Sequence, residues 1–192
     1  MRSIRAMRCP YCQSDLPPQT IECPACRLTF PRTVTLLGAT PRMAPGISDS
    51  SGSLTASEMN KLKKKIDALQ RRFPQLVLQV VLRSLPQEHP FSLYAFWLFN
   101  AGAFAGEGRR GKDNHAILLL IDPARRESAL MPGYGLELLL RPEALGHLLD
   151  LAGPVWEAGM WMEGIERVLG GLEKLLESVG VREEAVTADG EF

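Results

Sequence analysis

Apolar positions between residues 55 and 82 change from a helical to a strand-like pattern. Thr55-Ala-Ser-Glu58 fits a capping box, in which the Thr oxygen and the Glu carboxylate satisfy free N–H groups at a helix start. Apolar residues then recur at steps of three and four, at Met59, Leu62, Ile66, Leu69 and Phe73. Pro74 ends this predicted helix. The apolar run at residues 76–82 predicts a strand buried on both faces of a sheet.

The same reasoning extends to the rest of the chain. Residues 91–104 and 142–151 are predicted helices, and Trp161 begins a long final helix that Gly180 ends. Residues 116–121 are a second buried strand, and residues 126–131 a third, joined to it by a tight turn. One further short strand is expected at residues 33–37. Strands alternating with helices predict an α/β class, with a small mixed sheet of three or four strands and helices on both faces.

The four cysteines of the 192-residue chain lie together as Cys9-Pro-Tyr-Cys12 and Cys23-Pro-Ala-Cys26. Two such turns provide four thiolates for one tetrahedral zinc ion, with sulfur about 2.3 Å from the metal. The alternatives are two disulfides, which suit secreted domains, or a redox Cys-x-x-Cys, which usually stands alone beside a βαβ unit. We therefore predict a zinc ribbon, in which the metal supplies the folding energy. Four thiolates leave no open position, so this zinc is predicted to be structural.

Composition and charge limit the functional classes. Hydrophobic residues make up 45% of the chain, and the longest strongly apolar stretch, 91–104, is too short to cross a bilayer. The first residues show no apolar signal region, so we expect a cytoplasmic, reducing location. Residues 1–45 carry a net charge of +4 and residues 46–192 carry −4. A basic ribbon on an acidic body leaves nucleic acid open as a partner, although no aromatic–basic stripe supports it.

Three segments of the body resemble the TPM domain family. The family's Gly-Tyr-Gly-Leu-Glu motif is intact at residues 133–137. Lys112-Asp113-Asn114-His115 precedes the apolar strand 116–121, with His115 where the family usually has Gly. The family's opening segment matches at Ile47, Asp49, Gly52, Leu54 and Thr55. The resemblance implies a three-layer α/β/α domain at residues 47–180, after a ribbon at 1–30 and a linker at 31–46 and before a disordered acidic tail at 181–192.

The resemblance also implies a candidate second site. Some TPM proteins are linked to acid phosphatase activity and some to divalent cations. The corresponding candidates are Asp49, Asp113 and Glu137 as catalytic residues, with Asn114 as a further ligand of Ca²⁺ or Mg²⁺. The alternative is that these side chains cap turns, shape a loop or face solvent.

Three functions remain open. The favoured one is an interaction or complex-assembly factor, which binds a protein partner through the ribbon, with Tyr11 and Arg27 as contact candidates. The second is a divalent-metal-dependent acid phosphatase that uses the Asp/Glu cluster. The third is nucleic-acid binding through the basic ribbon.

Overall fold

The computed structural model describes residues 7–17, 20–40, 43–101, 115–137 and 139–188. The chain forms two compact units. One comprises Met1–Met43 with Leu85–Ala103, and the other comprises Ala44–Ser84 with Phe104–Phe192. This division differs from the expected domains, because a segment from the middle of the chain groups with the N-terminal residues. The expected domain boundaries stay a prediction.

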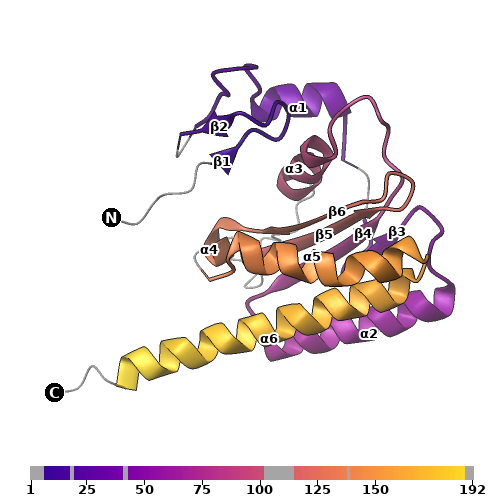
Figure 1. Cartoon of the computed structure of the whole chain (residues 1–192), viewed down its shortest axis with the longest axis vertical. Helices are drawn as coiled ribbons and strands as arrows, with labels where there is room; N and C mark the ends of the chain where they lie inside the picture. The colour runs from indigo at the N-terminus through magenta and orange to yellow at the C-terminus, as the bar shows by residue number, and fades with distance from the viewer. Residues whose placement is uncertain (1–6, 18–19, 41–42, 102–114, 138, 189–192) are drawn as a thin grey trace. The chain divides into compact units, whose positions relative to one another are not determined.

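The larger unit contains a four-stranded sheet. Its order is β3 (Ile47–Asp49), β4 (Val77–Leu82), β5 (Ala116–Asp122) and β6 (Glu127–Pro132) (Figure 1). The first three strands are parallel, and β6 pairs antiparallel with β5 through a tight hairpin. The predicted α/β class and mixed sheet are confirmed. β3 has only three residues, too few for an apolar pattern to indicate it.

Helices of this unit cover one face of the sheet. They are α2 (Ala56–Arg72), α4 (Tyr134–Glu137), α5 (Pro142–Glu157) and α6 (Trp161–Ala188). All four contribute to one apolar cluster with alternate residues of β4 and β5. The residues between those, such as Val81, Leu118 and Leu120, are buried as well, as predicted for strands covered on both faces. The second helical layer of the expected three-layer arrangement stays a prediction.

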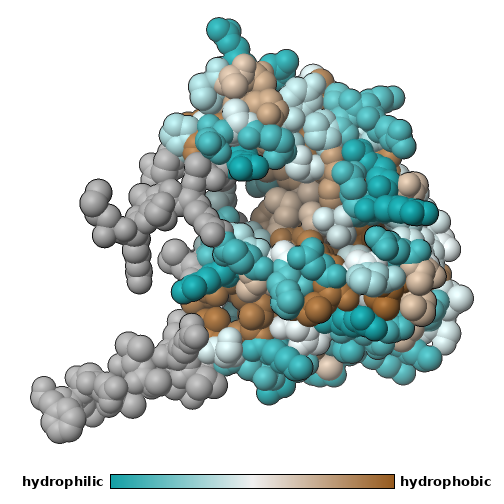
Figure 2. Space-filling view, in the orientation of Figure 1, coloured by the Kyte–Doolittle hydropathy of each residue, from teal (hydrophilic) through white to brown (hydrophobic). Residues whose placement is uncertain are grey.

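The start of α2 follows the predicted capping box. The Thr55 hydroxyl oxygen accepts from the Glu58 N–H at 3.3 Å, and the Glu58 carboxylate accepts from the Thr55 N–H at 2.8 Å. Outward-facing ion pairs join α2 to α6, with Arg72 between Glu173 at 2.9 Å and Glu177 at 2.6 Å. Hydrophilic residues also line much of the lower edge of Figure 2, where α2 lies.

The smaller unit joins a hairpin and two helices. β1 (Met7–Arg8) pairs antiparallel with β2 (Asp15–Leu16), and α1 (Phe30–Leu37) packs on α3 (Phe91–Ala101). The Phe30 and Phe96 rings meet edge to face at 6.1 Å. The Trp97 indole N–H donates to the Gly38 carbonyl at 3.2 Å. In sequence, α3 falls between β4 and β5 of the other unit.

Two predicted elements are wrong. Residues 33–37 lie in a helix because Thr29 caps its first turn, Pro31 suits that turn, and Gly38, at φ 79°, ends it. The final helix continues past Gly180 to Ala188, since one glycine costs a helix only about 1 kcal/mol. None of the helices in the described segments is long and apolar enough to span a membrane.

Candidate metal centre

Two turns of the same construction carry the four cysteines. In each, the residue after the second cysteine donates its N–H to the carbonyl of the first: Gln13 to Cys9 at 3.0 Å and Arg27 to Cys23 at 2.8 Å. Both donors are in the left-handed region, with φ of 62° for Gln13 and 57° for Arg27. Non-glycine residues pay about 1–2 kcal/mol for that conformation, so each turn stores strain that a bound metal can offset.

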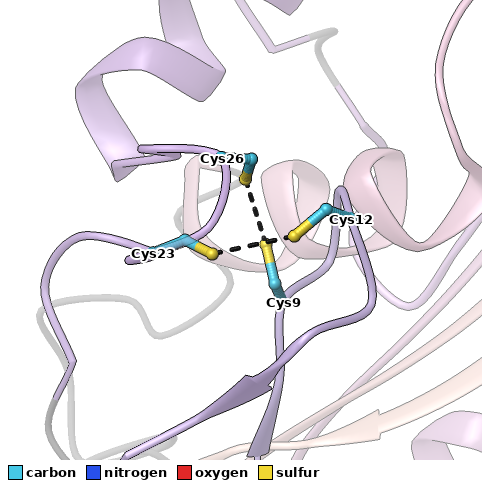
Figure 3. Close-up of side chains that lie close together, drawn as sticks. All are labelled: Cys9, Cys12, Cys23 and Cys26. Carbon is cyan, nitrogen blue, oxygen red and sulfur yellow. Dashed lines mark hydrogen bonds between the residues drawn. The ribbon is translucent and has the colours of Figure 1, made fainter.

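The turns bring the four sulfur atoms into one cluster (Figure 3). All four lie within 4.8 Å of one another, and the Cys9–Cys26 and Cys12–Cys23 Sγ pairs are each 3.7 Å apart. Sulfurs about 2.3 Å from a central zinc in a tetrahedron are separated by about 3.8 Å, so the spacing fits zinc. The cysteines form no disulfide. The residues that the sequence singles out for zinc therefore form a site of the right chemistry and size.

Hydrogen bonds to sulfur prepare the site for thiolates. The Ser14 hydroxyl lies 3.1 Å from the Cys12 Sγ and 3.4 Å from the Cys23 Sγ, so it connects the two turns. Hydrogen bonds from Ser14, and next from the Cys26 N–H, lower the pKa of Cys23 to about 6. Ser14 is likewise the main cause of a lowered pKa at Cys12. Such outer contacts orient ligands and adjust a metal site.

Burial acts in the opposite direction on the other two cysteines. Desolvation raises the pKa of Cys26 to about 12 and also raises that of Cys9, whose side chain is fully buried. Protons on these thiols must leave when zinc binds, so zinc affinity falls as pH falls.

Sequence reasoning missed Ser14. The equivalent position of the second turn is Leu28, and Cys9 and Cys23 each donate their N–H to the carbonyl of that position at 2.9 Å. A polar residue in one turn and an apolar one in the other is a detectable asymmetry. Its meaning becomes apparent only when the two turns face each other.

Asp49 and Glu137, two residues of the predicted carboxylate site, lie in different parts of the structure. The Asp49 carboxylate holds the loop into α2 by accepting hydrogen bonds from the Ser51 N–H at 2.8 Å, the Gly52 N–H at 3.0 Å and the Leu54 N–H at 2.8 Å. The Ser51 hydroxyl adds a fourth at 2.7 Å. This is the turn-forming role expected of a short acidic side chain. Asp113 and Asn114 lie outside the described residues.

Glu137 lies at the opposite edge of the sheet from Asp49. Asp49 is level with Leu82 and Ile121, at the ends of the parallel strands, whereas the Gly133 N–H donates to the Ala116 carbonyl where β5 begins. Five residues of β5 separate these levels by about 17 Å. The structure therefore does not bring Asp49 and Glu137 together. Glu137 is exposed, and partial desolvation of its carboxyl raises its pKa.

His115 immediately precedes β5, and Asp122 is its last residue. His115 is partly buried, and its carbonyl accepts from the Val77 N–H at 3.0 Å. Asp122 is fully buried, and its carboxylate accepts from the N–H groups of Ala124 and Arg125 at 3.0 and 3.1 Å, which closes the hairpin turn. Within the described segments, the four cysteines are the group of His, Cys, Asp or Glu residues whose ligand atoms converge.

The geometry defines an α/β protein with a four-cysteine cluster whose spacing is consistent with a zinc site. The family model of the TPM domain, named TPM_phosphatase, matches residues 47–175. The chain therefore belongs to the TPM domain family. No curated protein matches it.

Two solved structures are similar in fold. The N-terminal domain of a protein from P. gingivalis is 20% identical, with a TM-score of 0.55 over 76% of this chain and 88% of that one. The N-terminal domain of a protein from Corynebacterium glutamicum is 15% identical, with a TM-score of 0.51 over 70% of this chain and 82% of that one. At these identities the likeness establishes the fold.

Proposed function

We propose that the protein is an interaction factor in which a structural zinc ion organises a contact surface on a TPM-domain protein. The observation that carries the proposal is the closed set of four thiolates, which leaves zinc no position for a substrate. A structural zinc ion fixes the shape of the loops around it. Those loops expose large apolar side chains, with Ile21 89% and Tyr11 38% exposed.

The position of Ile21 favours a partner of protein chemistry. It lies two residues before Cys23, in the loop that links the two metal-binding turns, so its backbone is anchored nearby. Covering an exposed apolar side chain with a partner is favourable by about 25 cal/mol per Å². A few large side chains that become fully buried near the centre of an interface contribute most of its binding energy.

The test compares two charge substitutions in the zinc-loaded full chain. Ile21→Asp alters the proposed surface, and Leu151→Asp places the same charge at a half-exposed position on α5 of the larger unit. Affinity capture from the native host, quantified by mass spectrometry, is expected to lose specific proteins with Ile21→Asp and to keep them with Leu151→Asp. Equal recovery with both variants would contradict a contact role for the ribbon.

The alternative is a divalent-metal-dependent acid phosphatase, and its support is the name of the family model. The residues would be Asp113 and Glu137, with Asn114 as a further ligand of Ca²⁺ or Mg²⁺. Asp49 is a weaker candidate because four loop donors already occupy its carboxylate. Hydrolysis of a phosphate monoester across pH, with Mg²⁺, Mn²⁺, Ca²⁺ or EDTA, separates the two functions. Metal-dependent turnover that disappears in Asp113→Ala would replace the interaction proposal.

Nucleic-acid binding has less support. Arg8 pairs with Asp15 at 3.8 Å, and the Arg32 guanidinium donates to the carbonyls of Cys26 and Arg27 at 3.1 and 3.4 Å. The Arg32 guanidinium therefore serves the ribbon's own backbone. A cytoplasmic location fits four reduced thiols around zinc and stays part of the proposal.

A further inference from the structure

Helix α3 lies within the sequence segment that the TPM family model matches, but it folds with the N-terminal residues that carry the four cysteines. Its residues, Phe91–Ala101, fall within the segment 47–175 that the TPM model matches. In the folded chain, however, Leu85–Ala103 forms one compact unit with Met1–Met43. A helix inserted between β4 and β5 is thus held by residues that precede the TPM domain in sequence.

The apolar contact reaches the metal ligands themselves. Leu93 is fully buried in a cluster with Leu16, Leu28 and the two buried cysteines, Cys9 and Cys23. Closing the metal site gathers those two cysteines from separate turns. The surface on which Leu93 rests is therefore complete only when both turns are in place.

Polar contacts join the start of α3 to the first metal-binding turn. The Ser92 hydroxyl donates to the Pro10 carbonyl at 2.6 Å and accepts from the Gln13 side-chain amide at 3.0 Å. Pro10 lies between Cys9 and Cys12, and Gln13 follows them. The neighbouring rings continue this contact, with Tyr11 6.1 Å from His89 and His89 6.3 Å from Tyr94.

The α3 helix needs cover on most of its sides. Six of its eleven residues are buried, and they are spread around the helix rather than along one stripe: Phe91, Leu93, Tyr94, Ala95, Trp97 and Leu98. Such a helix is stable only when packed. An isolated helix of this length is also marginal in water, since helices shorter than about 12–15 residues seldom form alone.

We propose that zinc binding to the four cysteines controls the folding of α3. Loss of the metal then releases residues 85–101, which belong to the TPM segment in sequence, from their packing on the ribbon. The ribbon has few core residues apart from its cysteines, and such small metal modules fold with their metal. When the ribbon unfolds, α3 loses the contacts of Leu93 and Ser92 together. The larger unit has its own core and keeps it.

Hydrogen exchange of the full chain tests this inference. Zinc-loaded protein is compared with reduced protein stripped by a chelator, and deuterium uptake is read by mass spectrometry. We expect protection to fall together in residues 7–37 and 91–101, while α2 and β5 stay protected. Protection of 91–101 that survives loss of the ribbon would overturn the inference, as would a ribbon that stays protected without metal. Simultaneous loss in α2 and β5 would also overturn it, because the release would then be global.

Thermodynamic linkage between zinc binding and the contact of α3 with the ribbon provides a second test, which does not require the metal-free protein to be unfolded. If zinc supports the contact between α3 and the ribbon, weakening that contact must weaken zinc binding by the same factor. Ser92→Ala removes two hydrogen bonds and is expected to reduce zinc affinity about two- to tenfold in a competition assay with a chelating dye. Ser178→Ala, which removes a hydroxyl bonded within α6, is the matched control and should change nothing. Unchanged zinc affinity in Ser92→Ala would contradict the coupling.

Discussion

Two glycines of α6, Gly164 and Gly170, differ in how closely neighbouring side chains approach them. Gly164 lies where α6 crosses the end of α5, and a methyl group there would overlap the indole of Trp156, with the ring carbon Cε2 only 2.6 Å away. Trp156 is 7% exposed, and its indole N–H donates to the Trp161 carbonyl at 3.3 Å. Gly170 occupies the same helix with nothing within 4 Å of the added methyl group.

The two substitutions are therefore predicted to have opposite signs. Alanine in place of glycine in a helix interior gains about 0.5–1 kcal/mol. At Gly170 that gain is the whole effect. At Gly164 the rigid indole must shift, which costs about 1–3 kcal/mol by overpacking and weakens its hydrogen bond. After the propensity gain is subtracted, we expect Gly164→Ala to destabilise the larger unit by up to about 2 kcal/mol and Gly170→Ala to stabilise it.

Urea unfolding of zinc-loaded protein, followed by far-UV circular dichroism, measures both effects. Gly171→Ala adds an intermediate case, because its methyl group would meet a flexible leucine end, the Leu148 Cδ2. In a domain of this size, 1 kcal/mol moves the melting temperature by about 2–4 °C. If Gly164→Ala and Gly170→Ala stabilised the protein equally, the close packing of α5 on α6 would be refuted.

Three further predictions concern single side chains. Ser14→Ala removes the hydroxyl between the two cysteine turns and should weaken zinc binding about tenfold or more, as measured by chelator competition. Hydrogen bonds from Thr55, first from its hydroxyl and then from its N–H, lower the pKa of Glu58. The Glu58 carboxylate therefore stabilises the protein fully above about pH 4.3, the ordinary pKa of a Glu carboxyl, and this stabilisation is lost as pH falls through the lowered pKa. Thermal melts of wild type and Glu58→Gln should therefore differ at neutral pH and converge in acid. Asp49→Ala should cost about 1–3 kcal/mol by freeing the loop donors, and Ca²⁺ should leave the melting temperature of the wild type unchanged.

The metal centre could be predicted from the sequence because all its information is local. Four cysteines within eighteen positions, in two Cys-Pro-x-Cys turns, leave one arrangement that satisfies a tetrahedral metal. The capping box of α2 is local in the same way and is confirmed. The wrong strand at residues 33–37 shows the limit of apolar pattern alone, because Thr29, Pro31 and Gly38 carried the helical information there.

The partnership of α3 with the ribbon could not be predicted in this way. Ser92 and Pro10 are 82 positions apart, and neither has a neighbourhood that indicates the other. The apolar residues of α3 indicate a buried helix, yet they do not say which surface buries it. A pattern that is apolar on most sides fits any partner, so tertiary structure alone assigns it.

The direction of each strand determines whether Asp49 and Glu137 can belong to one carboxylate site. The predicted hairpin between residues 116–121 and 126–131 already implies that the segment after β6 returns to the edge where β5 begins. Asp49 ends β3, which runs parallel to β5, so it must lie at the other edge. A carboxylate site built around Glu137 and one built around Asp49 are thus two sites and not one. If metal-dependent phosphatase activity is found, Glu137→Gln should abolish it, while loss in Asp49→Ala should follow only from the loosened loop and recover when folding is restored.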